Sequence, residues 1–453
     1  MPEIYEPTPP DGQNVRVRFM EAAVDIDQWV SYSFHSHLLN PTDGFSLTIS
    51  GAMTERQRKA IVARAWVRLY VDQLPLADGF IDRVRISADR SSGVVYEIEG
   101  RSRIGLTVDA GTDPTLSFKE GATLLDVMKG IFEPFGWVQA DAFQVDNRAN
   151  RNAKLGIRGT PMTKGGKKKG PRPLKDFVQH QLKPHNHEGA YQFASRIAER
   201  HGLRIWGTSD GEQIVVAAPD YEQEPTYQLR RTLDGAGNIE SGSVDFDGTD
   251  QASIIVADGH SHSAEFGLSP VKSYCVNPYF GVDKDGFVLD EVSYLIAKYP
   301  DAQQVVMTVQ PYTMRAIGEP MRPVYLHDGE SKTQEQLNNF VRREMSLLVR
   351  KSLSCHYIVE GHGQTVGGIF VPWDIDTVVD VQDDVAGLHE RLYVVGRSLE
   401  KSRSGGTHAR LELIRLHSLE LGEPAEDAPK PKMKPASVAA PPPTPSKHVT
   451  EIR

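Results

Sequence analysis

Residues 67–87, VRLYVDQLPLADGFIDRVRIS, set the fold because a similar stretch, VVDVQDDVAGLHERLYVVGRSL, follows at residues 378–399. Each stretch reads as a strand, a short acidic turn and a second strand, and each leads into a Ser/Gly turn and another alternating strand. These turns and strands are 91–93 with 94–99, and 402–406 with 409–414. β-Meanders in general share this pattern, so the repeat is weak by itself. It nevertheless predicts two small antiparallel β-barrels of one kind in a single chain.

The first barrel is expected over residues 1–108. Alternation of apolar and polar residues predicts strands at 15–19, 45–49 and 67–71. Turn signals at Asp78-Gly79 and at 91–93 are expected to bound two more strands. These two strands are 80–86 and 94–99.

An α+β domain is expected over residues 109–222. A compact apolar helix at 123–132 has Thr123 and Asp126 placed for a cap and Pro134 as its stop. A second helix, 189–201, leads into a hairpin with a Ser-Asp-Gly turn at 209–211. Between the two helices lies a long polar insertion, 141–183, which is rich in lysine.

The second barrel is expected over residues 223–264 and 331–418, where strand character returns on both sides of a mixed segment. The mixed segment, 265–330, holds a short helix at 291–299 and is expected to be an α+β piece that packs with 109–222. Ser331 and Gln334 form a capping-box pair ahead of an amphipathic helix. The apolar face of that helix is Leu337, Phe340, Val341, Met345 and Leu348. Residues 419–453 are Pro-rich and are expected to form an extended tail.

Bulk properties exclude several classes. The 453 residues are 39% hydrophobic and 25% charged, as in a folded soluble protein. A formal net charge of −9 argues against a protein whose main task is to grip nucleic acid. Cys275 and Cys355 are far apart and form no CxxC spacing, so neither a disulfide framework nor a zinc site is expected. Residues 1–12 lack the features of a signal peptide, and no apolar run is long enough to span a bilayer. Folding in a cytoplasm without membrane insertion is therefore expected.

A set of short motifs, in order from residue 60 to 418, resembles the baseplate hub proteins of Mu-like phage tails, which are related to the N-terminal hub part of type VI secretion spike proteins. The motifs are DGFID at 78–82, EGRS at 99–102, TLLDV at 123–127, PFG at 134–136, AYQF at 190–193, ERHGL at 199–203, SDG at 209–211, NIES at 238–241, RRE at 342–344, Gly361, VP at 371–372 and GGT at 405–407. The chain departs from the family at 184–189, PHNHEG, where a Pro-Gly-Glu-Ser-like turn is usual. The basic insertion and the Pro-rich tail have no counterpart in the family.

The resemblance implies a multidomain β and α+β protein that assembles as a ring-shaped homotrimer. Three chains with two similar barrels each would present six near-equivalent edges to a sixfold tail tube and threefold symmetry to a spike below. The implied function is that of a non-enzymatic adaptor in the virion baseplate, assembled in the host cytoplasm. The expected partners are the tube, the spike and other baseplate proteins, with phage DNA passing through the central channel without sequence recognition.

No catalytic, cofactor-binding or metal-ligating residue is assigned from the sequence. The basic run of the insertion is the candidate contact with nucleic acid or an acidic partner, although a solvated flexible insertion is the favoured interpretation. The run consists of Lys164, Lys167, Lys168, Lys169, Arg172 and Lys175. Three histidine pairs, 35/37, 185/187 and 260/262, lack a third ligand nearby and are interpreted as polar loops or turns.

Three alternatives remain open at this stage. The first is the hub of a secretion-type contractile injection system, although such chains usually continue into a long β-helical spike. The second is a tail-associated cell-wall hydrolase, which predicts an inserted catalytic domain. The third is a DNA-binding tail component that works through residues 160–175.

Overall fold

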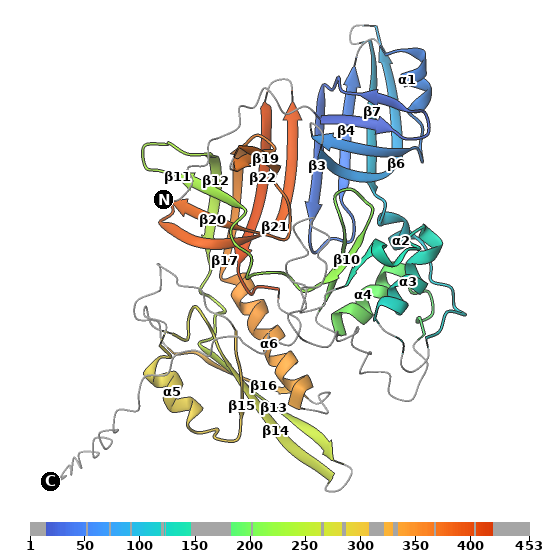
Figure 1. Cartoon of the computed structure of the whole chain (residues 1–453). Coiled ribbons are helices and arrows are strands. Elements are labelled where there is room, and N and C mark those ends of the chain that lie inside the picture. The colour runs from blue at the N-terminus through green and yellow to red at the C-terminus, as the bar shows by residue number, and fades with distance from the viewer. Residues whose placement is uncertain are drawn as a thin grey trace, which may run out of the picture.

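The structure is a computed structural model that describes residues 15–50, 53–71, 74–90, 93–118, 122, 124–145, 183–200, 203–263, 267–282, 287–307, 321–328, 334–366, 368–402 and 405–419. Its largest feature is a thirteen-stranded, mostly antiparallel sheet that runs through two halves of the molecule. The halves lie side by side at the top of Figure 1, with a helical unit and an inserted unit below them. The mainly β fold class predicted from the sequence is confirmed.

The first half is built from seven strands and one short helix. They are β1 (Val15–Phe19), β2 (Val24–Ile26), β3 (Ser31–His37), β4 (Gly44–Ser50), α1 (Glu55–Ala60), β5 (Trp66–Val71), β6 (Leu74–Asp89) and β7 (Gly93–Ser102). Alternate residues of β1, β4 and β5 face the core, as their sequence alternation predicted.

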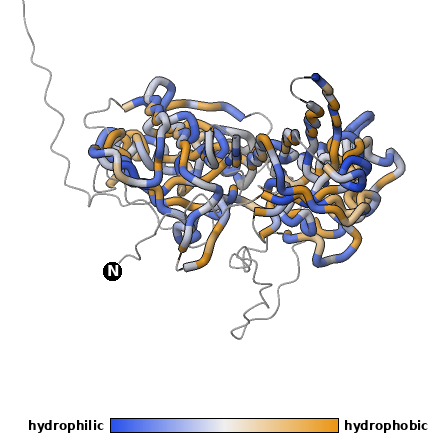
Figure 2. Tube along the Cα trace, turned by 90° about the horizontal axis from the view of Figure 1, so that it is seen from above, coloured by the Kyte–Doolittle hydropathy of each residue, from blue (hydrophilic) through white to orange (hydrophobic). Residues whose placement is uncertain are grey.

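The second half contributes six strands to the same sheet and carries a separate hairpin. They are β11 (Tyr227–Arg231), β12 (Ile239–Phe246), β17 (Leu353–Glu360), β20 (Thr377–Asp383), β21 (Leu388–Ser402) and β22 (Gly406–Arg415), with β18 (Gly363–Val366) and β19 (Ile369–Pro372) as the hairpin. One hydrophobic core extends through both halves, from Val15 to Leu413. Seen from above, the strands alternate between hydrophilic and hydrophobic positions (Figure 2).

The strand pairings confirm the repeat predicted from residues 67–87 and 378–399. The first half has the order β3-β4-β7-β6-β5 and the second half the order β12-β17-β22-β21-β20, with antiparallel pairing throughout. Chain order is also the same in the two halves. The two repeats therefore share a topology as well as a sequence pattern.

Two separate closed barrels are not what the structure forms, and this part of the prediction is corrected. β21 is long enough to pair with β20 along Leu388–Val394 and with β3 along Gly396–Ser402. This pairing fuses the two halves into one sheet that ends at β2 and β12, and the pairings among the described strands close neither half.

Asp78-Gly79, predicted as a turn, lies inside β6 instead. Both residues are in register with β5, opposite Arg68 and Val67. Glycine is required at position 79 because a Cβ there would lie 2.1 Å from the carbonyl oxygen of Arg101. The dipeptide therefore marks a close approach of two strands rather than a chain reversal.

The helical unit contains the predicted helix–hairpin arrangement. Its elements are α2 (Gly105–Asp109), α3 (Leu124–Phe132), η2 (Glu133–Phe135), η3 (Ala140–Ala142), β8 (Phe143–Val145), α4 (Ala190–Arg200), β9 (Arg204–Gly207) and β10 (Ile214–Ala217). α3 stops as predicted at Pro134, where a 3-10 turn ends in Gly136 at φ +90°. The Thr123 cap lies outside the described residues.

The inserted unit occupies the chain between β12 and β17, where the first repeat has only the short β3–β4 connection. Its elements are β13 (Ile254–Ser263), β14 (Gly267–Val276), α5 (Asp290–Ile296), β15 (Gln303–Val305), β16 (Pro323–Asp328) and α6 (Gln334–Lys351). Ile255 and Ala257 of β13 share a core with α6, whereas Ile254 and Val256 share one with α5. A four-stranded sheet is therefore covered by a helix on each face.

This unit differs from the expected grouping. β13 was placed in the second barrel, but its partners are β14 and β16 in the inserted unit. Residues 265–330, expected against 109–222, share their cores with β13 and α6. The division into independent domains stays a prediction. Among the described helices, none combines the length and apolar character needed to cross a membrane.

Candidate functional site

The predicted basic contact lies outside the described residues. Residues 146–182 contain all six of its side chains, Lys164, Lys167, Lys168, Lys169, Arg172 and Lys175. Its contact with DNA or an acidic partner remains a prediction.

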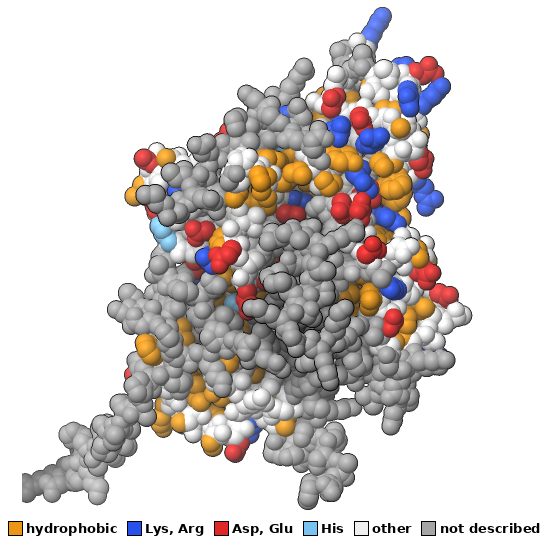
Figure 3. Space-filling view, in the orientation of Figure 1, with side chains coloured by type: hydrophobic (Ala, Val, Ile, Leu, Met, Phe, Trp, Pro, Cys, Tyr) orange, Lys and Arg blue, Asp and Glu red, His pale blue; other side chains and the backbone are white. Residues whose placement is uncertain are grey.

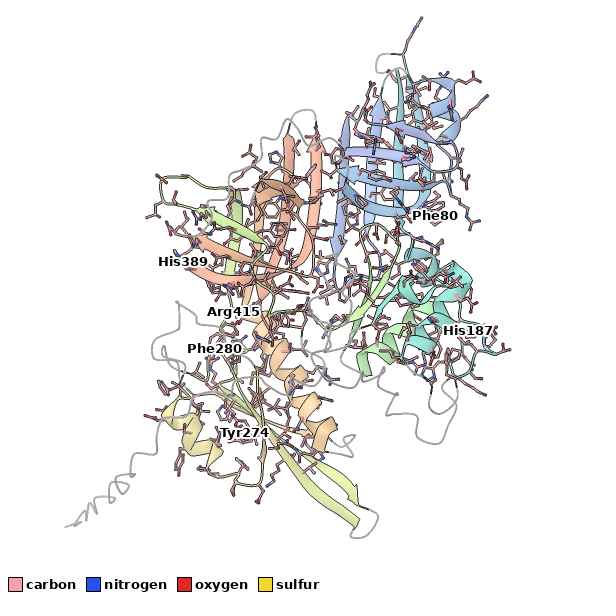
Figure 4. The ribbon with its side chains drawn as sticks, viewed as in Figure 1. Phe80, His187, Tyr274, Phe280, His389 and Arg415 are labelled. Atoms are coloured by element: carbon pink, nitrogen blue, oxygen red, sulfur yellow. The ribbon has the colours of Figure 1, made fainter. Side chains whose placement is uncertain are left out.

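The histidine pairs are separated in space and in role. His35 and His37 belong to strand β3, which corrects their interpretation as a loop, and His37 Nε2 lies 3.3 Å from Glu412 Oε2. His185 and His187 precede α4 and are exposed, with His187 far from the large sheet in Figure 4. The side chains of the third pair lie outside the described residues. Among the residues described, no three His, Cys, Asp or Glu side chains cluster as a metal site.

Buried polar side chains instead gather where the parts of the chain meet. The first of these contacts, here called the Asp78 joint, involves Asp78, Trp66 and Arg68 of the first half and Gly211 of the helical unit. It connects the first half to the helical unit. Asp78 is 2% exposed and accepts hydrogen bonds from Trp66 Nε1 at 2.7 Å and Arg68 Nε at 3.3 Å. Burial raises the pKa of Asp78 against the effect of these two donors. Gly211, at φ +67°, allows the hairpin of the helical unit to approach, because a Cβ there would lie 2.3 Å from Asp78 Cβ.

The Arg397 joint connects three parts. Arg397 of β21 is 5% exposed and donates to the carbonyl oxygen of Trp373. Its Nη2 lies 3.3 Å from Asp374 Oδ1 and 3.4 Å from Ser209 Oγ of the helical unit. Its guanidinium also stacks over Phe34 of β3, 5.4 Å from the ring centre. One side chain thus holds the second half, the first half and the helical unit in fixed relation.

The Arg415 joint connects the second half to the inserted unit. Arg415 Nε lies 3.5 Å from Glu390 Oε1, and Nη1 donates to Ser352 Oγ at 2.6 Å. The guanidinium also lies over the ring of Tyr279, 4.2 Å from its centre. Figure 4 shows Arg415 at the lower end of the second half with Phe280 below it.

The titratable groups of these joints are enclosed. Burial raises the pKa of Glu390 to about 7, although Arg415 opposes the shift. Burial lowers the pKa of His362 to about 3, and its Nε2 lies 2.5 Å from the Tyr32 hydroxyl. Cys355 and Cys275 are free thiols inside the protein, and burial raises the pKa of Cys355. Glu390 and His362 contact side chains from other strands, whereas the two thiols lie within hydrophobic cores, and such burial suits rigidity better than contact with a substrate.

The joints were missed by the sequence reasoning, although a signal was present. Arg397 interrupts an apolar strand, LYVVGRSL at 392–399, and Arg415 interrupts LELIRLHSL at 411–419. A lone arginine on an otherwise apolar strand indicates a buried ion pair or a buried carbonyl acceptor.

On the visible surface of the first half, acidic and basic side chains are interspersed (Figure 3).

Comparisons with known proteins agree with this architecture. A tail protein from Neisseria meningitidis MC58 aligns at a TM-score of 0.60 and 20% sequence identity, covering 90% of this chain and 99% of that one. The 43 kDa tail protein of prophage MuSo2 from Shewanella oneidensis aligns at 0.60 and 16% identity, with the same coverage. A component of the type VI secretion system from E. coli aligns at 0.42 and 11% identity over 90% of this chain and 78% of that one, too distant to establish a shared fold. No protein-family model matches the sequence, and no match to a curated protein is found.

The architecture and these alignments define the class: the chain has a phage tail protein fold. In particular, it shares the fold of the Neisseria and Shewanella tail proteins over nearly their whole length. The resemblance to Mu-like tail proteins inferred from the sequence is confirmed at the level of the fold.

Proposed function

We propose that this chain is a structural hub of a contractile phage tail baseplate. In this role it is a trimeric adaptor that joins a sixfold tail tube to a threefold central spike around a channel for DNA. Its partners are copies of itself, the tube, the spike and neighbouring baseplate proteins. It works in the virion and assembles in the host cytoplasm.

The duplicated sheet is the observation that carries this proposal. One chain contains two repeats with the same strand order, and the repeats are joined edge to edge by β3 and β21. Three such chains supply six repeats, so a ring of three has a sixfold pattern of sheets and threefold symmetry elsewhere. The inserted unit is present in the second repeat alone, so it occurs three times per ring and suits contact with a threefold partner.

A non-enzymatic role is supported by the placement of the unusual titratable groups. Glu390, Asp78 and His362 lie inside the protein at or near contacts between its parts. Their hydrogen bonds and ion pairs fix the orientation of one part against another. An adaptor needs such rigid connections because it must hold two partners in register.

The test is the absolute mass of the purified full chain by light scattering, with negative-stain images of the same peak. The expected result is three times the mass of one chain and a ring with an open centre and threefold symmetry. A protein that stays monomeric at about 100 µM contradicts a self-assembling hub, since ring formation at lower concentration is typical of interfaces of standard size. Measurement of peptidoglycan hydrolysis on the same sample then tests the cell-wall hydrolase alternative.

A further inference from the structure

Among the strand edges of the large sheet that lack a partner strand in the described pairings are those of β12 and of the outer part of β6. β12 is the last strand in the sheet order and pairs only with β17. β6 pairs with β5 up to Phe80, so from Arg83 to Asp89 it has β7 on one side alone. Unpaired edges are templates for pairing with another chain, and proteins usually cover or shorten them.

The chain itself contains a model for how these edges pair. In the second repeat, the equivalent part of β21 is covered by β3, from Gly396 opposite His37 to Ser402 opposite Ser31. The equivalence is set by two landmarks. A bulge follows Ile81 in β6 and Val394 in β21, and glycines with positive φ, Gly93 and Gly406, begin the next strand. By both landmarks, each residue of β6 is equivalent to the residue of β21 whose number is higher by 313.

β3 and β12 are equivalent in the same way. Ser31 of β3 pairs with Thr48 of β4, which in turn pairs with Glu97 of β7. In the second repeat, Ser241 of β12 pairs with Ile358 of β17, which in turn pairs with Arg410 of β22. Because Glu97 and Arg410 are equivalent, β3 and β12 are related by a shift of 210 residues.

Applying both shifts to the β3–β21 pairing gives a register for β12 on β6. The register places Asp247 opposite Arg83, Phe246 opposite Val84, Asp245 opposite Arg85, Val244 opposite Ile86 and Ser243 opposite Ser87. Both arginines therefore face aspartates, and the aliphatic Val84 and Ile86 face the apolar Phe246 and Val244. A shift by one residue would place Arg85 opposite Val244 or Phe246, and a shift by two would leave one of the arginines without an aspartate, so the chemistry favours this register.

Exposure agrees with an interface that a single chain leaves open. Ile86 is 59% exposed and Phe246 is 45% exposed, although both belong to strands of the main sheet. Their equivalents are Leu399 for Ile86 and Ser36 for Phe246, and these are 0% and 3% exposed because β3 and β21 cover each other. The same positions are thus buried where the strands meet within the chain.

We propose that β12 of one copy adds antiparallel to Arg83–Asp89 of β6 in a second copy, in this register. The inference rests on the proposed function and specifies its interface. The contact is head-to-tail, since different edges of the two copies meet, and such contacts form a closed ring when the rotation from one copy to the next divides a full turn. In a ring of three copies, three β3–β21 junctions within chains alternate with three β12–β6 junctions between chains.

Charge reversal tests the contact between Arg85 and Asp245. Arg85→Glu alone, or Asp245→Arg alone, is expected to weaken ring assembly about tenfold per interface, because each opposes like charges across the edge. Arg85→Glu combined with Asp245→Arg restores the opposite charges and is expected to return assembly to within about threefold of the parent. The readout is the mass distribution by light scattering over a dilution series.

A matched control separates this contact from one within the chain. Arg85 Nη1 also lies 3.7 Å from Glu97 Oε2 of β7. Arg85→Glu with Glu97→Arg repairs that pair but leaves the new carboxylate on β6 facing Asp245 of the next copy. This variant is expected to assemble as poorly as Arg85→Glu alone. Full rescue by Glu97→Arg would overturn the proposed contact.

Disulfide trapping tests the register directly. Ile86→Cys with Val244→Cys is expected to give covalent dimers and trimers on mild oxidation, because opposed residues of antiparallel strands bring their Cβ atoms within reach of a disulfide. Ile86→Cys with Phe246→Cys, two residues out of register on the same face of β12, is the control and is expected to cross-link at least tenfold less. The native cysteines are buried and give a low background.

The outcomes separate the two proposals. A threefold ring whose cysteine pair does not cross-link overturns the edge pairing and leaves the hub function standing. Stronger cross-linking of the control pair overturns the register. A chain that is monomeric and uncross-linked at about 100 µM overturns both the interface and the proposed function.

Discussion

The outer halves of β6 and β21 have the same place in two repeats but opposite surroundings. β21 from Gly396 to Ser402 lies between β22 and β3, and Leu399 is fully buried. β6 from Arg83 to Asp89 has β7 on one side, and the equivalent Ile86 is 59% exposed. The bulge and the glycine turn are the same, so the strand conformation is a property of the repeat, whereas its burial depends on the neighbouring strand.

The side chains follow this difference. Arg397 of β21 and Val84 of β6 are equivalent, since each lies three residues after the start of its bulge. Arg397 connects three parts of the chain, whereas Val84 is apolar. At the other end of the strand, β21 has the buried Glu390, and β6 has Ala77. At these two positions the polar connections lie on the repeat that carries the inserted unit, whereas the Asp78 joint lies on β6 of the first repeat.

The largest effect is expected from removing the Arg397 joint. Arg397→Ala should lower the free energy of unfolding by about 4 kcal/mol, because it leaves a cavity and an unpaired buried carbonyl at Trp373. Val84→Ala at the equivalent position should cost about 1 kcal/mol. Urea unfolding of both variants checks the difference, and equal losses would contradict the distinction between covered and open strands.

The next effect is expected at the pair Leu399 and Ile86. Leu399→Ala should cost about 3 kcal/mol, because the side chain is fully buried. Ile86→Ala should change the stability of the dilute single chain by about 0.5 kcal/mol at most. Scanning calorimetry at low concentration measures both. A large loss for Ile86→Ala in the monomer would show that the open edge is packed within its own chain.

A pH dependence should come from the Arg415 joint. Burial raises the pKa of Glu390 to about 7 from its ordinary 4.5, so the folded state binds this proton more tightly than the unfolded state. Its contribution to stability is therefore fully present below about pH 4.5 and is lost as pH rises through about 7.

Glu390→Gln should remove this dependence. Between pH 4.5 and 7 the parent should lose on the order of 3 kcal/mol relative to the variant. Urea midpoints measured across this range test the slope, and Ala77→Val in the first repeat is the control that should leave it unchanged. Parallel pH profiles for the parent and Glu390→Gln would show that the ion pair with Arg415 keeps Glu390 charged.

The smallest effect is expected at the two turn glycines, and it should be equal in the two repeats. Gly93 and Gly406 have φ values of +73° and +76°. Gly93→Ala and Gly406→Ala should each cost about 1 kcal/mol, because a Cβ is strained in this conformation. Thermal unfolding of both variants tests the equivalence. Costs that differ by more than about 1 kcal/mol would show that neighbouring strands affect the turns.

Sequence reasoning predicted the elements better than their assembly. Alternation located β1, β4 and β5, apolar periodicity located α3 and α4, Pro134 located the end of α3, and the repeat was visible from two stretches. β13 was assigned to the wrong sheet because apolar alternation indicates a strand without indicating its partner. Asp78-Gly79 was taken as a turn because the same two residues also suit a close approach between strands.

The sequence by itself determined the strand periodicity, the two glycine turns and the apolar helix faces, because these depend on local backbone preferences and on alternation over a few residues. The tertiary structure alone decided that β3 covers β21, that Arg397 and Arg415 become joints, and that no other described strand pairs with the outer edges of β6 and β12. Strand pairing joins residues hundreds of positions apart, and a strand's sequence specifies the face that it buries but not the strand that lies beside it.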